Sequence, residues 1–292
     1  MHETLTLADL QRLEWKNPCL GVLGDPIAHS LSPVMHQAAI DALQDKHPAL
    51  KSLKYLRLHI KAEELAEALD LLFKHGFLGL NLTVPHKIAA LKLVASLSPE
   101  AKAAGSVNTL TRTSQGWAGH TTDGGGFLSA LEEKSGQSIQ GKSVVILGAG
   151  GAARAIAHAC LTAGCGSLLI ASRDESKAEV LAKNFNDPRV KTSALANLTK
   201  VEKDAIIVNC TTLGLNPSDE LPLPREVLNS HQFVFDTTYG KHRSRLLKTA
   251  DDLGIKNCDG RSMLRWQGTL AFQQWTGMIP PAEPMRQAIG ER

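Results

Sequence analysis

Two side chains capable of acid–base chemistry stand out in the first half of this 292-residue chain. Lys87 follows an apolar segment and Pro85, and Asp123 precedes three successive glycines. The helix dipole disfavours the charged form of a lysine at a helix start, so such a lysine exchanges a proton more readily near neutral pH. Asp123 beside it would hold the ammonium group, and the two would titrate as a coupled pair. The alternatives are a solvated surface lysine and an aspartate that caps a helix.

Short polar side chains accompany this pair at the ends of predicted strands. Ser30 and Ser32 lie two apart in GDPIAHSLSP, Thr83 lies in NLTVPHK, and Asn108 lies in SVNT. Residues two apart in an extended segment point to one side, so both serine hydroxyls can bind neighbouring hydroxyls or a carboxylate of a small ligand. Ser32 before Pro33 also fits an ordinary N-cap, which would explain Ser32 but not Ser30.

A glycine-rich turn follows the apolar residues 144–147 in the sequence VVILGAGGAARA. A strand, a tight turn and a small-residue helix in this order are typical of a dinucleotide-binding βαβ unit. Gly148 allows the turn, Gly150 lets the backbone approach a pyrophosphate, and Ala153 keeps helix and strand close. The second strand of the unit is predicted at residues 168–171, which favours dinucleotide binding over a merely structural glycine turn.

The end of that second strand indicates which dinucleotide binds. Ser172, Arg173 and Asp174 stand where the adenosine ribose should lie. Arg173 can form a bidentate contact with a 2′-phosphate and Ser172 can donate to it, so these residues favour NADP over NAD. Asp174 keeps NAD open, since a carboxylate there usually binds the ribose 2′-OH, but it also fits the cap of a helix that begins at Glu175. A solvated surface arginine is the alternative for Arg173.

The elements that position these residues alternate along the chain. In the first part, the pattern predicts strands at residues 20–23, 55–60 and 79–84, helices at 33–43, 63–74 and 87–95, and a pair of antiparallel strands at 106–113 and 116–121. Alternation of this kind predicts a mainly parallel sheet with helices on both faces, and hence a three-layer α/β domain. Residues 1–17 carry no motif and are interpreted as a short helix or a loose end.

The second part of the chain continues the dinucleotide-binding pattern. Glycines 124–126 suggest a hinge between domains or a tight turn with close packing, before a helix at 127–134. After the glycine-rich turn, strands are predicted at 205–209 and 233–236, and helices at 245–253 and 262–276. The length suits two domains, and the expected fold class is α/β, with a Rossmann domain after the first α/β layer.

Composition excludes several classes of function. The net charge of +3 comes from interspersed signs and gives no case for nucleic acid; the basic run at 241–245 is more simply a solvated loop. The five cysteines are scattered without a CxxC pair, which favours reduced thiols in a cytoplasmic protein and argues against a metal site. The start of the chain lacks the pattern of a signal peptide, and no apolar run is long enough for a membrane span. We expect a cytoplasmic protein with a small-molecule substrate.

Taken together, these motifs resemble the shikimate dehydrogenases, which reduce 3-dehydroshikimate with NADP. The matching segments run in family order from about residue 20 to the end: GDPIAHSLSP, NLTVPHK, SVNT, TTDGGGF, GAGGAAR, SRD, NCTTLGL and DGRSMLRWQGTLAFQQWTG. The resemblance implies an NADP-dependent oxidoreductase of the aromatic amino-acid and chorismate pathway. Reduction of a ring ketone needs a hydride from the nicotinamide and a proton for the nascent alkoxide, which Lys87 can supply.

The resemblance also implies residue roles and domain limits. Lys87 and Asp123 would be the catalytic pair. The substrate would be bound by Ser30, Ser32, Thr83, Lys87, Asn108, Asp123, Tyr239 and Gln267. The cofactor-binding site would be lined by Gly148, Ala149, Gly150, Gly151, Ala152, Ser172, Arg173, Thr237 and Gly260. The helix that carries Gln267 would return to the first domain, which gives a substrate domain of residues 1–123 completed by 261–292 and a Rossmann domain of 124–260.

Two departures from the family pattern keep alternatives open. Thr121 stands where the family usually has Asn in NTD, and Ser172-Arg173-Asp174 replaces the common NRT. A quinate or quinate/shikimate dehydrogenase, with NAD as its cofactor, is therefore the alternative enzyme. A cofactor-sensing protein without turnover is a further alternative, although such a protein should have lost Lys87 or Asp123. The sequence leaves monomer and homodimer open.

Overall fold

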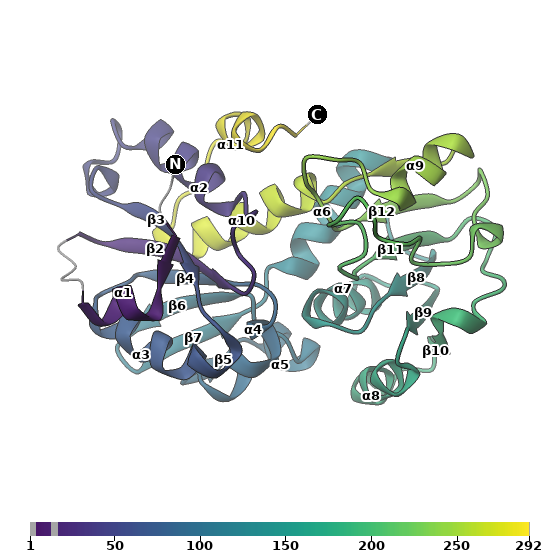
Figure 1. Cartoon of the computed structure of the whole chain (residues 1–292), viewed down its shortest axis with the longest axis horizontal. Coiled ribbons are helices and arrows are strands. Elements are labelled where there is room, and N and C mark those ends of the chain that lie inside the picture. Colours follow the sequence, from purple (N-terminus) through teal and green to yellow (C-terminus); the bar gives the residue numbers. More distant parts are fainter. Residues whose placement is uncertain (1–3, 13–16, 292) are drawn as a thin grey trace. The chain divides into compact units, whose positions relative to one another are not determined.

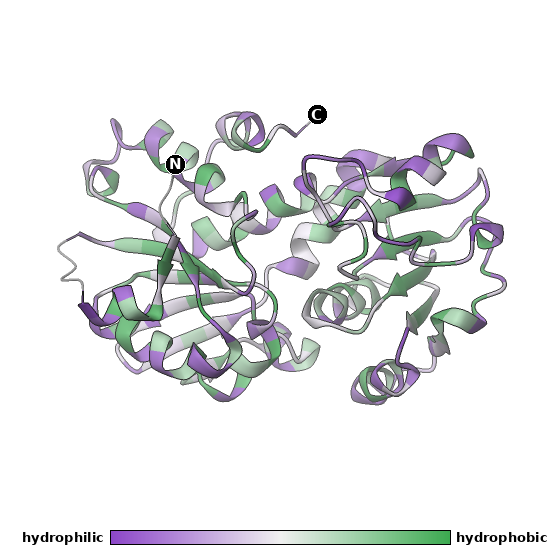
Figure 2. Cartoon of the chain, viewed as in Figure 1, coloured by the Kyte–Doolittle hydropathy of each residue, from purple (hydrophilic) through white to green (hydrophobic). Residues whose placement is uncertain are grey.

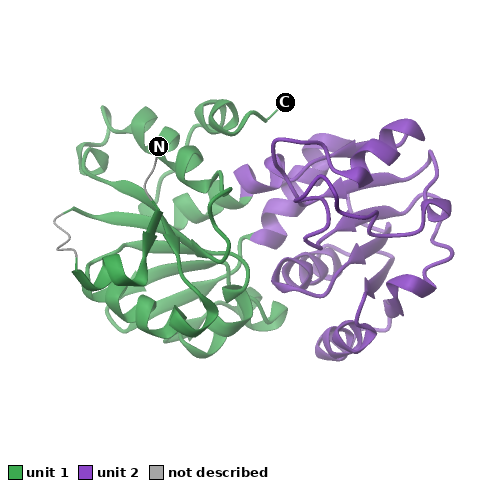
Figure 3. Cartoon of the chain, in the orientation of Figure 1, with its two compact units in different colours: residues 1–122, 267–292 green, residues 123–266 purple. Residues whose placement is uncertain are grey.

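The computed structural model describes residues 4–12 and 17–291, and the chain divides into two compact units. The first unit comprises Met1–Thr122 with Gln267–Arg292, and the second comprises Asp123–Trp266 (Figure 3). One helix, α10 (Arg261–Thr276), contains the boundary between Trp266 and Gln267. Among the described residues, no helix combines the length and the apolar character that a membrane crossing requires.

The first unit is built on a seven-stranded sheet in the order β1-β3-β2-β4-β6-β7-β5. Its strands are β1 (Thr4–Thr6), β2 (Cys19–Gly24), β3 (Lys54–His59), β4 (Gly79–Leu82), β5 (Ser96–Leu97), β6 (Thr109–Thr113) and β7 (Gly116–His120). The first four pair in parallel, whereas β6 runs antiparallel to β4 and to β7. This confirms the predicted mainly parallel sheet with an antiparallel pair of strands. The two-residue strand β5 was not predicted; it pairs with β7 and is the outermost strand on that side of the sheet.

Helices pack on both faces of this sheet because successive strand residues point to opposite sides. The helices are α1 (Leu7–Arg12), α2 (Ser32–Leu43), α3 (Leu65–Lys74), α4 (His86–Ala89), α5 (Pro99–Ala104), the C-terminal part of α10, and α11 (Ala282–Ile289) (Figure 1). Leu58 and Leu80 lie in one buried cluster with α1 and α3 residues. On the other face, Tyr55 stacks on His36 of α2, and Gly79 contacts Trp275 of α10.

The second unit contains a six-stranded, entirely parallel sheet in the order β10-β9-β8-β11-β12-β13. Numbered within the unit, this is the order 3-2-1-4-5-6 of a Rossmann fold, as the sequence predicts. The strands are β8 (Ser143–Leu147), β9 (Ser167–Ser172), β10 (Val190–Ala194), β11 (Ile206–Asn209), β12 (Phe233–Asp236) and β13 (Lys256–Cys258). Strands β10 and β13 were not predicted.

Both faces of this second sheet are apolar and covered. Val144 and Ile146 of β8 lie in one buried cluster, and Val145 and Leu147 lie in another, so the strand is buried on both sides. This explains why parallel strands read as continuous hydrophobic runs, and Figure 2 shows the strands of this unit mainly in the hydrophobic colour. The helices are α6 (Asp123–Ser135), α7 (Gly151–Thr162), α8 (Glu175–Phe185), α9 (Arg245–Asp252) and the N-terminal part of α10.

Three segments differ from the sequence-based expectations. Glycines 124–126 lie in the first turn of α6 instead of a turn before it. Gly124 serves close packing, because a Cβ at this position would lie 2.6 Å from the Ala155 carbonyl oxygen and 2.7 Å from the Ala159 Cβ. The helix predicted at 87–95 is short: α4 ends at Ala89 and a 3-10 turn follows. Within residues 1–17, strand β1 pairs with β3, α1 follows, and residues 1–3 and 13–16 lie outside the described residues.

Candidate active site

In the first unit, four polar segments begin at the same edge of the sheet. Strands β2 and β4 are parallel neighbours, so their carboxyl ends lie together. Because β6 is antiparallel to β4, its first residue Thr109 pairs with Asn81 near the end of β4. Strand β7 then returns, and its last residue His120 pairs with Thr109. Ligands of open α/β sheets bind beyond the carboxyl ends of the strands. These strand ends therefore form the candidate substrate-binding edge, which is distinct from the outermost strand β5.

Most of the predicted substrate-binding residues start from this edge. Ser30 and Ser32 follow β2, Thr83 and Lys87 follow β4, and Asn108 precedes β6. Gln267 comes from α10 and belongs to the same unit. Asp123 and Tyr239 belong to the second unit, the former as the first residue of α6.

The loop after β2 is held by side chains of the neighbouring strand β3. Arg57 donates to the Ser30 carbonyl oxygen at 2.8 Å, and the His59 Nε2 atom lies 2.7 Å from Asp25 Oδ1. Ser30 Oγ accepts a hydrogen bond from the Ser32 backbone N–H at 3.3 Å. Ser32 is already the first residue of α2 and makes no capping bond, so the N-cap interpretation of Ser32 was wrong. The serine pair instead forms a local turn that orders the loop.

Lys87 lies on the short helix α4, half-buried, directly after His86. Its carbonyl oxygen accepts the Val107 N–H at 2.8 Å, which ties α4 to the segment that leads into Asn108. His86 is buried and its Nε2 atom bonds the Ile60 carbonyl oxygen at 2.8 Å. Burial lowers the pKa of His86, so this histidine is a neutral structural residue at the strand end.

Asn108 and Gln267 meet directly, although 159 positions separate them in sequence. The Asn108 Nδ2 group donates to Gln267 Oε1 at 3.2 Å and to Thr122 Oγ1 at 2.9 Å. The Thr122 backbone N–H donates to Asn108 Oδ1 at 2.7 Å, and Thr109 Oγ1 donates to the same oxygen at 3.2 Å. All four side chains are buried. The edge therefore contains a neutral network of amide and hydroxyl groups, suited to binding hydroxyls and a carboxylate.

Tyr55 and Thr122 belong to this network and were not predicted from the sequence. Tyr55 donates to Asn81 Oδ1 at 2.7 Å, and Asn81 Nδ2 donates to the Asn108 carbonyl oxygen and to Thr109 Oγ1, both at 3.2 Å. A tyrosine within a predicted strand could have indicated this, because a buried tyrosine hydroxyl usually finds a partner. Thr122 carried no signal beyond its position next to Asp123.

The glycine-rich turn of the second unit has the geometry that a dinucleotide requires. Gly148 has φ +106°, which favours glycine, and a Cβ there would lie 3.2 Å from the Cys210 carbonyl oxygen. A Cβ on Gly150 would meet nothing within 4 Å, so its exposed backbone is accessible to a phosphate. Gly150 precedes α7, whose first N–H groups have no partner within the helix and favour an anion, while Ala153 is fully buried. These residues fit a bound dinucleotide.

At the end of β9, Ser172 is buried, whereas Arg173 and Asp174 are exposed. Asp174 is the N-cap residue of α8, but its side chain makes no bond to the helix backbone. Its carboxylate accepts a hydrogen bond from Ser176 Oγ at 2.6 Å and lies 3.5 Å from Lys177 Nζ. The hydrogen bond from Ser176 is the main reason that the pKa of Asp174 is lowered. Local partners thus hold this carboxylate at the start of α8.

Thr237 and Tyr239 follow the end of β12, next to the end of β11. Gly260 contacts the same segment. The Thr237 N–H and Oγ1 groups both donate to the Asn209 carbonyl oxygen, at 3.0 and 2.7 Å. Gly260 donates to the Thr238 carbonyl oxygen at 3.0 Å, and a Cβ on Gly260 would collide with the Thr237 carbonyl. A glycine at position 260 is therefore needed for this close backbone approach.

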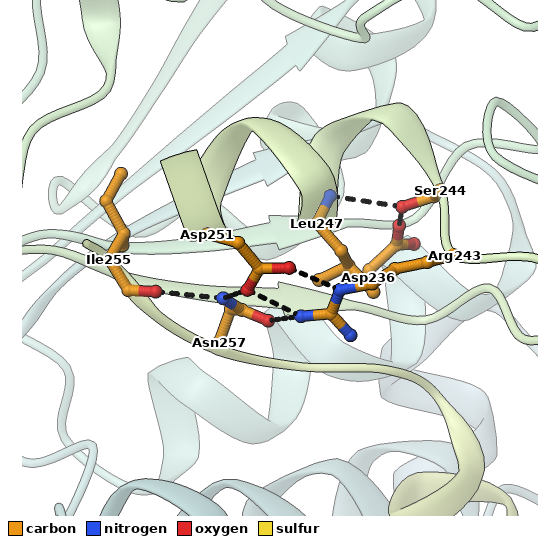
Figure 4. A network of polar contacts seen from close by, with 7 residues as sticks. All are labelled: Asp236, Arg243, Ser244, Leu247, Asp251, Ile255 and Asn257. Atoms are coloured by element: carbon orange, nitrogen blue, oxygen red, sulfur yellow. Dashed lines mark hydrogen bonds and ion pairs between the residues drawn. The ribbon is translucent and has the colours of Figure 1, made fainter. Parts of the chain in front are cut away.

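A buried carboxylate organises the same loop. Asp236 is fully buried and accepts hydrogen bonds from Asn209 Nδ2 (2.9 Å), the Thr238 N–H (3.0 Å), Thr238 Oγ1 (2.8 Å) and Ser244 Oγ (2.6 Å). Burial raises the pKa of Asp236, although these donors oppose the rise. Ser244 also caps α9 by accepting the Leu247 N–H at 3.2 Å (Figure 4). The segment that carries Tyr239 is thus anchored to β12.

The basic run at 241–245 has a structural explanation. Arg243 donates to both carboxylate oxygens of Asp251, at 2.5 and 2.8 Å, and to Asn257 Oδ1 at 2.6 Å (Figure 4). Asn257 Nδ2 in turn donates to Asp251 Oδ1 at 2.9 Å. The run therefore joins α9 to β13 through Arg243. Within residues 4–12 and 17–291, no group of three or more His, Cys, Asp or Glu side chains is arranged to hold a metal ion.

Comparison with known proteins assigns these units. Three family models match the chain: a shikimate dehydrogenase substrate binding domain at residues 22–110, shikimate/quinate 5-dehydrogenase at 130–218, and a shikimate 5′-dehydrogenase C-terminal domain at 260–289. The shikimate dehydrogenase (NADP(+)) of Moorella thermoacetica is 39% identical over 279 residues, 93% of this chain and 92% of that protein.

Solved structures agree in fold over nearly the whole chain. A crystal structure of shikimate dehydrogenase in complex with NADP+ has a TM-score of 0.84 and 35% identity, covering 94% of this chain and 95% of the other. The Thermus thermophilus shikimate 5-dehydrogenase in complex with NADP(H) and shikimate has a TM-score of 0.81 and 35% identity, covering 94% and 98%. With both units, the motifs and these relatives in agreement, the chain belongs to the shikimate dehydrogenase family.

Proposed function

We propose that this chain catalyses the reversible, NADP-dependent reduction of 3-dehydroshikimate to shikimate. The single observation that carries the proposal is the 39% identity to a shikimate dehydrogenase (NADP(+)) over 93% of the chain. Geometry supports it as well: one unit has a dinucleotide turn on a 3-2-1-4-5-6 sheet, and the other has a sheet edge of neutral polar groups. The enzyme is an oxidoreductase that acts on a CH–OH group.

The second unit is the proposed cofactor domain. Gly148, Gly150 and the first N–H groups of α7 would bind the pyrophosphate. Arg173 would bind the 2′-phosphate, and Ser172 at the end of β9 would donate to it. The hydrogen bond from Ser176 and the nearby Lys177 support this assignment, because they hold the Asp174 carboxylate at the start of α8. A carboxylate held there is not expected to bind the ribose 2′-OH of NAD. Ala149, Gly151, Ala152, Thr237 and Gly260 complete the proposed lining.

The first unit is the proposed substrate domain, completed by Gln267 and the helices that follow. Ser30, Ser32, Thr83 and Asn108 start from one sheet edge, and Gln267 contacts Asn108. A site built to hydrogen-bond several hydroxyls rejects analogues that lack one, because buried polar groups would then lose their partners. Asp123 and Tyr239 are assigned to the substrate as well, and a polar ring of this composition suits a polyhydroxylated carboxylic acid.

Lys87 is the proposed general acid and base, with Asp123 as its partner. NADPH, when bound, supplies the hydride that reduces the ketone carbon. Lys87 donates a proton from its ammonium group to the carbonyl oxygen, which completes the hydroxyl group, and it accepts that proton in the reverse direction. Asp123 holds the ammonium group in position through its negative charge. We place the activity in the cytoplasm, as the scattered cysteines favour, and propose a monomer or a homodimer.

Initial rates with four substrate and cofactor pairs test this function. Shikimate or quinate is combined with NADP or NAD, and the appearance of reduced nicotinamide is followed by absorbance. We expect the highest kcat/KM with shikimate and NADP. A higher value for quinate, or for NAD, would favour the alternative of a quinate or quinate/shikimate dehydrogenase. No reduction in any of the four mixtures would contradict the proposed function.

A further inference from the structure

Strand β3 carries no residue that we assign to the substrate, but two of its side chains bond the loop after β2, residues 25–31. Arg57 and His59 are two apart in the strand, so they point to the same face. We propose that Arg57 and His59 are positioning residues for substrate binding, which fix this loop so that Ser30 and Ser32 are presented in one conformation. This inference rests on the proposed function of the same sheet edge, and both residues act through the serines instead of touching the substrate.

The Arg57 side chain makes its bond to the part of the loop that carries the first serine. Its Nη2 group donates to the Ser30 carbonyl oxygen at 2.8 Å. This is the only hydrogen bond that the Arg57 side chain makes to a residue that the structure describes, and no described carboxylate forms an ion pair with it. The side chain is half-buried, and a hydrogen bond from a charged donor is stronger than a neutral one. The bond therefore fixes the backbone from which the Ser30 hydroxyl extends.

The His59 side chain holds the other end of the loop. Its Nε2 atom lies 2.7 Å from Asp25 Oδ1, and because a carboxylate oxygen only accepts, Nε2 is the donor. Both side chains are 40% exposed, so we expect a smaller contribution from this pair than from Arg57. The Asp25 backbone N–H also donates to the Val84 carbonyl oxygen at 2.9 Å, which ties the loop to the segment that leads to Lys87.

The next residue, Ile60, connects the end of β3 to both loops through its backbone. The Ile60 N–H donates to the Gly24 carbonyl oxygen at 3.3 Å, and the Ile60 carbonyl oxygen bonds His86 Nε2 at 2.8 Å. His86 directly precedes Lys87. The end of β3 therefore holds the segments after β2 and after β4, although β3 and β4 are not neighbours in the sheet.

The Ser30 hydroxyl is the group whose position this arrangement determines. Ser30 Oγ accepts the Ser32 N–H at 3.3 Å, and the Ser30 N–H donates to the Ile27 carbonyl oxygen at 3.0 Å. No described residue accepts a hydrogen bond from the Ser30 hydroxyl, so its hydrogen is directed to an acceptor outside the described chain. A loop that is already fixed costs a ligand less ordering entropy, and this saving contributes to the affinity for the ligand.

Three variants test the positioning role by steady-state kinetics. Arg57→Met keeps an unbranched stem and removes the donors, so we expect the KM for shikimate to rise about tenfold while kcat and the KM for NADP stay within about twofold. Arg57→Lys restores the charge and a donor, and should recover most of the lost affinity. His59→Phe should raise the KM for shikimate about threefold, because its ion pair is exposed. A purely structural role would lower the melting temperature and leave the KM for shikimate unchanged below it.

Hydrogen exchange followed by mass spectrometry measures the loop itself and does not depend on turnover. Without ligand, a peptide that covers residues 25–32 should exchange faster in Arg57→Met than in the parent. Arg112→Met is the matched control, because Arg112 is also half-buried and donates to a backbone carbonyl oxygen of the same unit, that of Phe73. Its own N–H bonds Leu78, which precedes β4, so it lies away from the loop. This control should leave the KM for shikimate and the exchange of residues 25–32 unchanged.

The outcomes separate the positioning role from the proposed function. If the unsubstituted enzyme is active but Arg57→Met keeps the original KM for shikimate, the positioning role is wrong, whether or not the loop exchanges faster. An equal rise in the KM values for shikimate and NADP would also contradict it. If the unsubstituted enzyme fails to oxidise shikimate with either cofactor, the proposed function itself is wrong, and exchange of residues 25–32 at the parent's rate in Arg57→Met would show separately that Arg57 does not order the loop.

Discussion

The groups that we propose to bind ligands are of different kinds in the two units. The first unit presents side chains, since Lys87, Asn108 and Gln267 extend from strand ends and from a helix. The second unit presents mainly backbone, since Gly150 is exposed with open space around it and the first N–H groups of α7 follow it directly. A side-chain site is damaged by deletion of a polar atom, whereas a backbone site is damaged by addition of a carbon atom. The same kind of substitution should therefore have different consequences in the two units.

The largest effect is expected from deletion in the first unit. Lys87→Ala should lower kcat for shikimate oxidation by about 10³-fold, because a positioned acid–base group contributes roughly 10²–10⁴-fold. The KM for shikimate should change much less, since the substrate hydroxyls keep their other partners. Lys87→Arg keeps the charge and cannot release the proton, so it should be similarly slow. The exposed Lys92, on the following turn, gives the control Lys92→Ala; unchanged turnover in Lys87→Ala would remove Lys87 from the mechanism.

Addition of one methyl group tests the backbone site. Gly150→Ala should raise the KM for NADP by about thirtyfold, since overpacking against a ligand costs about 2 kcal/mol. The melting temperature without cofactor should stay the same, because a Cβ at position 150 meets no protein atom within 4 Å. Gly148→Ala is the contrasting variant: its φ of +106° disfavours alanine, so it should be less stable even without cofactor. Equal melting temperatures for these two variants would contradict the assigned roles.

Arg173 is an exception in the second unit, because it is a side chain assigned to the cofactor. Arg173→Ala should raise the KM for NADP by about tenfold, which corresponds to one charge-assisted contact of about 1.4 kcal/mol. The KM for NAD should not change, since NAD lacks the 2′-phosphate. Arg225→Ala removes another exposed arginine of this unit and serves as the control. An equal rise in KM for both cofactors would mean that Arg173 does not bind the 2′-phosphate of NADP.

The sequence predicts the backbone site better than the side-chain network. The dinucleotide turn lies within 33 consecutive residues, 142–174, so that local rules apply to it. The contact between Asn108 and Gln267 joins residues 159 positions apart, and no local sequence pattern indicates it. Tyr55 and Thr122 were missed for the same reason. The glycines of α6 were predicted in part: close packing was one of the two expected roles, but their place inside the helix and the packing of Gly124 against α7 depend on the tertiary structure.

The units also differ in how their buried titratable groups respond to pH. His36 in the first unit is fully buried, and burial lowers its pKa from 6.5 to about 3. Asp236 in the second unit is buried with a raised pKa. Below pH 6.5 the unfolded chain takes up a proton at His36 that the folded chain does not, so stability falls with falling pH. The folded chain holds a proton at Asp236 above pH 3.8 that the unfolded chain releases, so its contribution falls with rising pH.

The smallest expected effect is the change in stability with pH that His36 causes. Between pH 7.5 and pH 5.5, linkage predicts that His36 reduces the free energy of unfolding by about 1 kcal/mol, or about 3 °C in melting temperature. His36→Phe keeps an aromatic ring in the stack with Tyr55 and removes the titratable group, so this variant should lose less stability over that interval than the parent. Equal slopes for His36→Phe and the parent would mean that the folded chain takes up the same proton at position 36 as the unfolded chain, so that burial does not lower the pKa of His36.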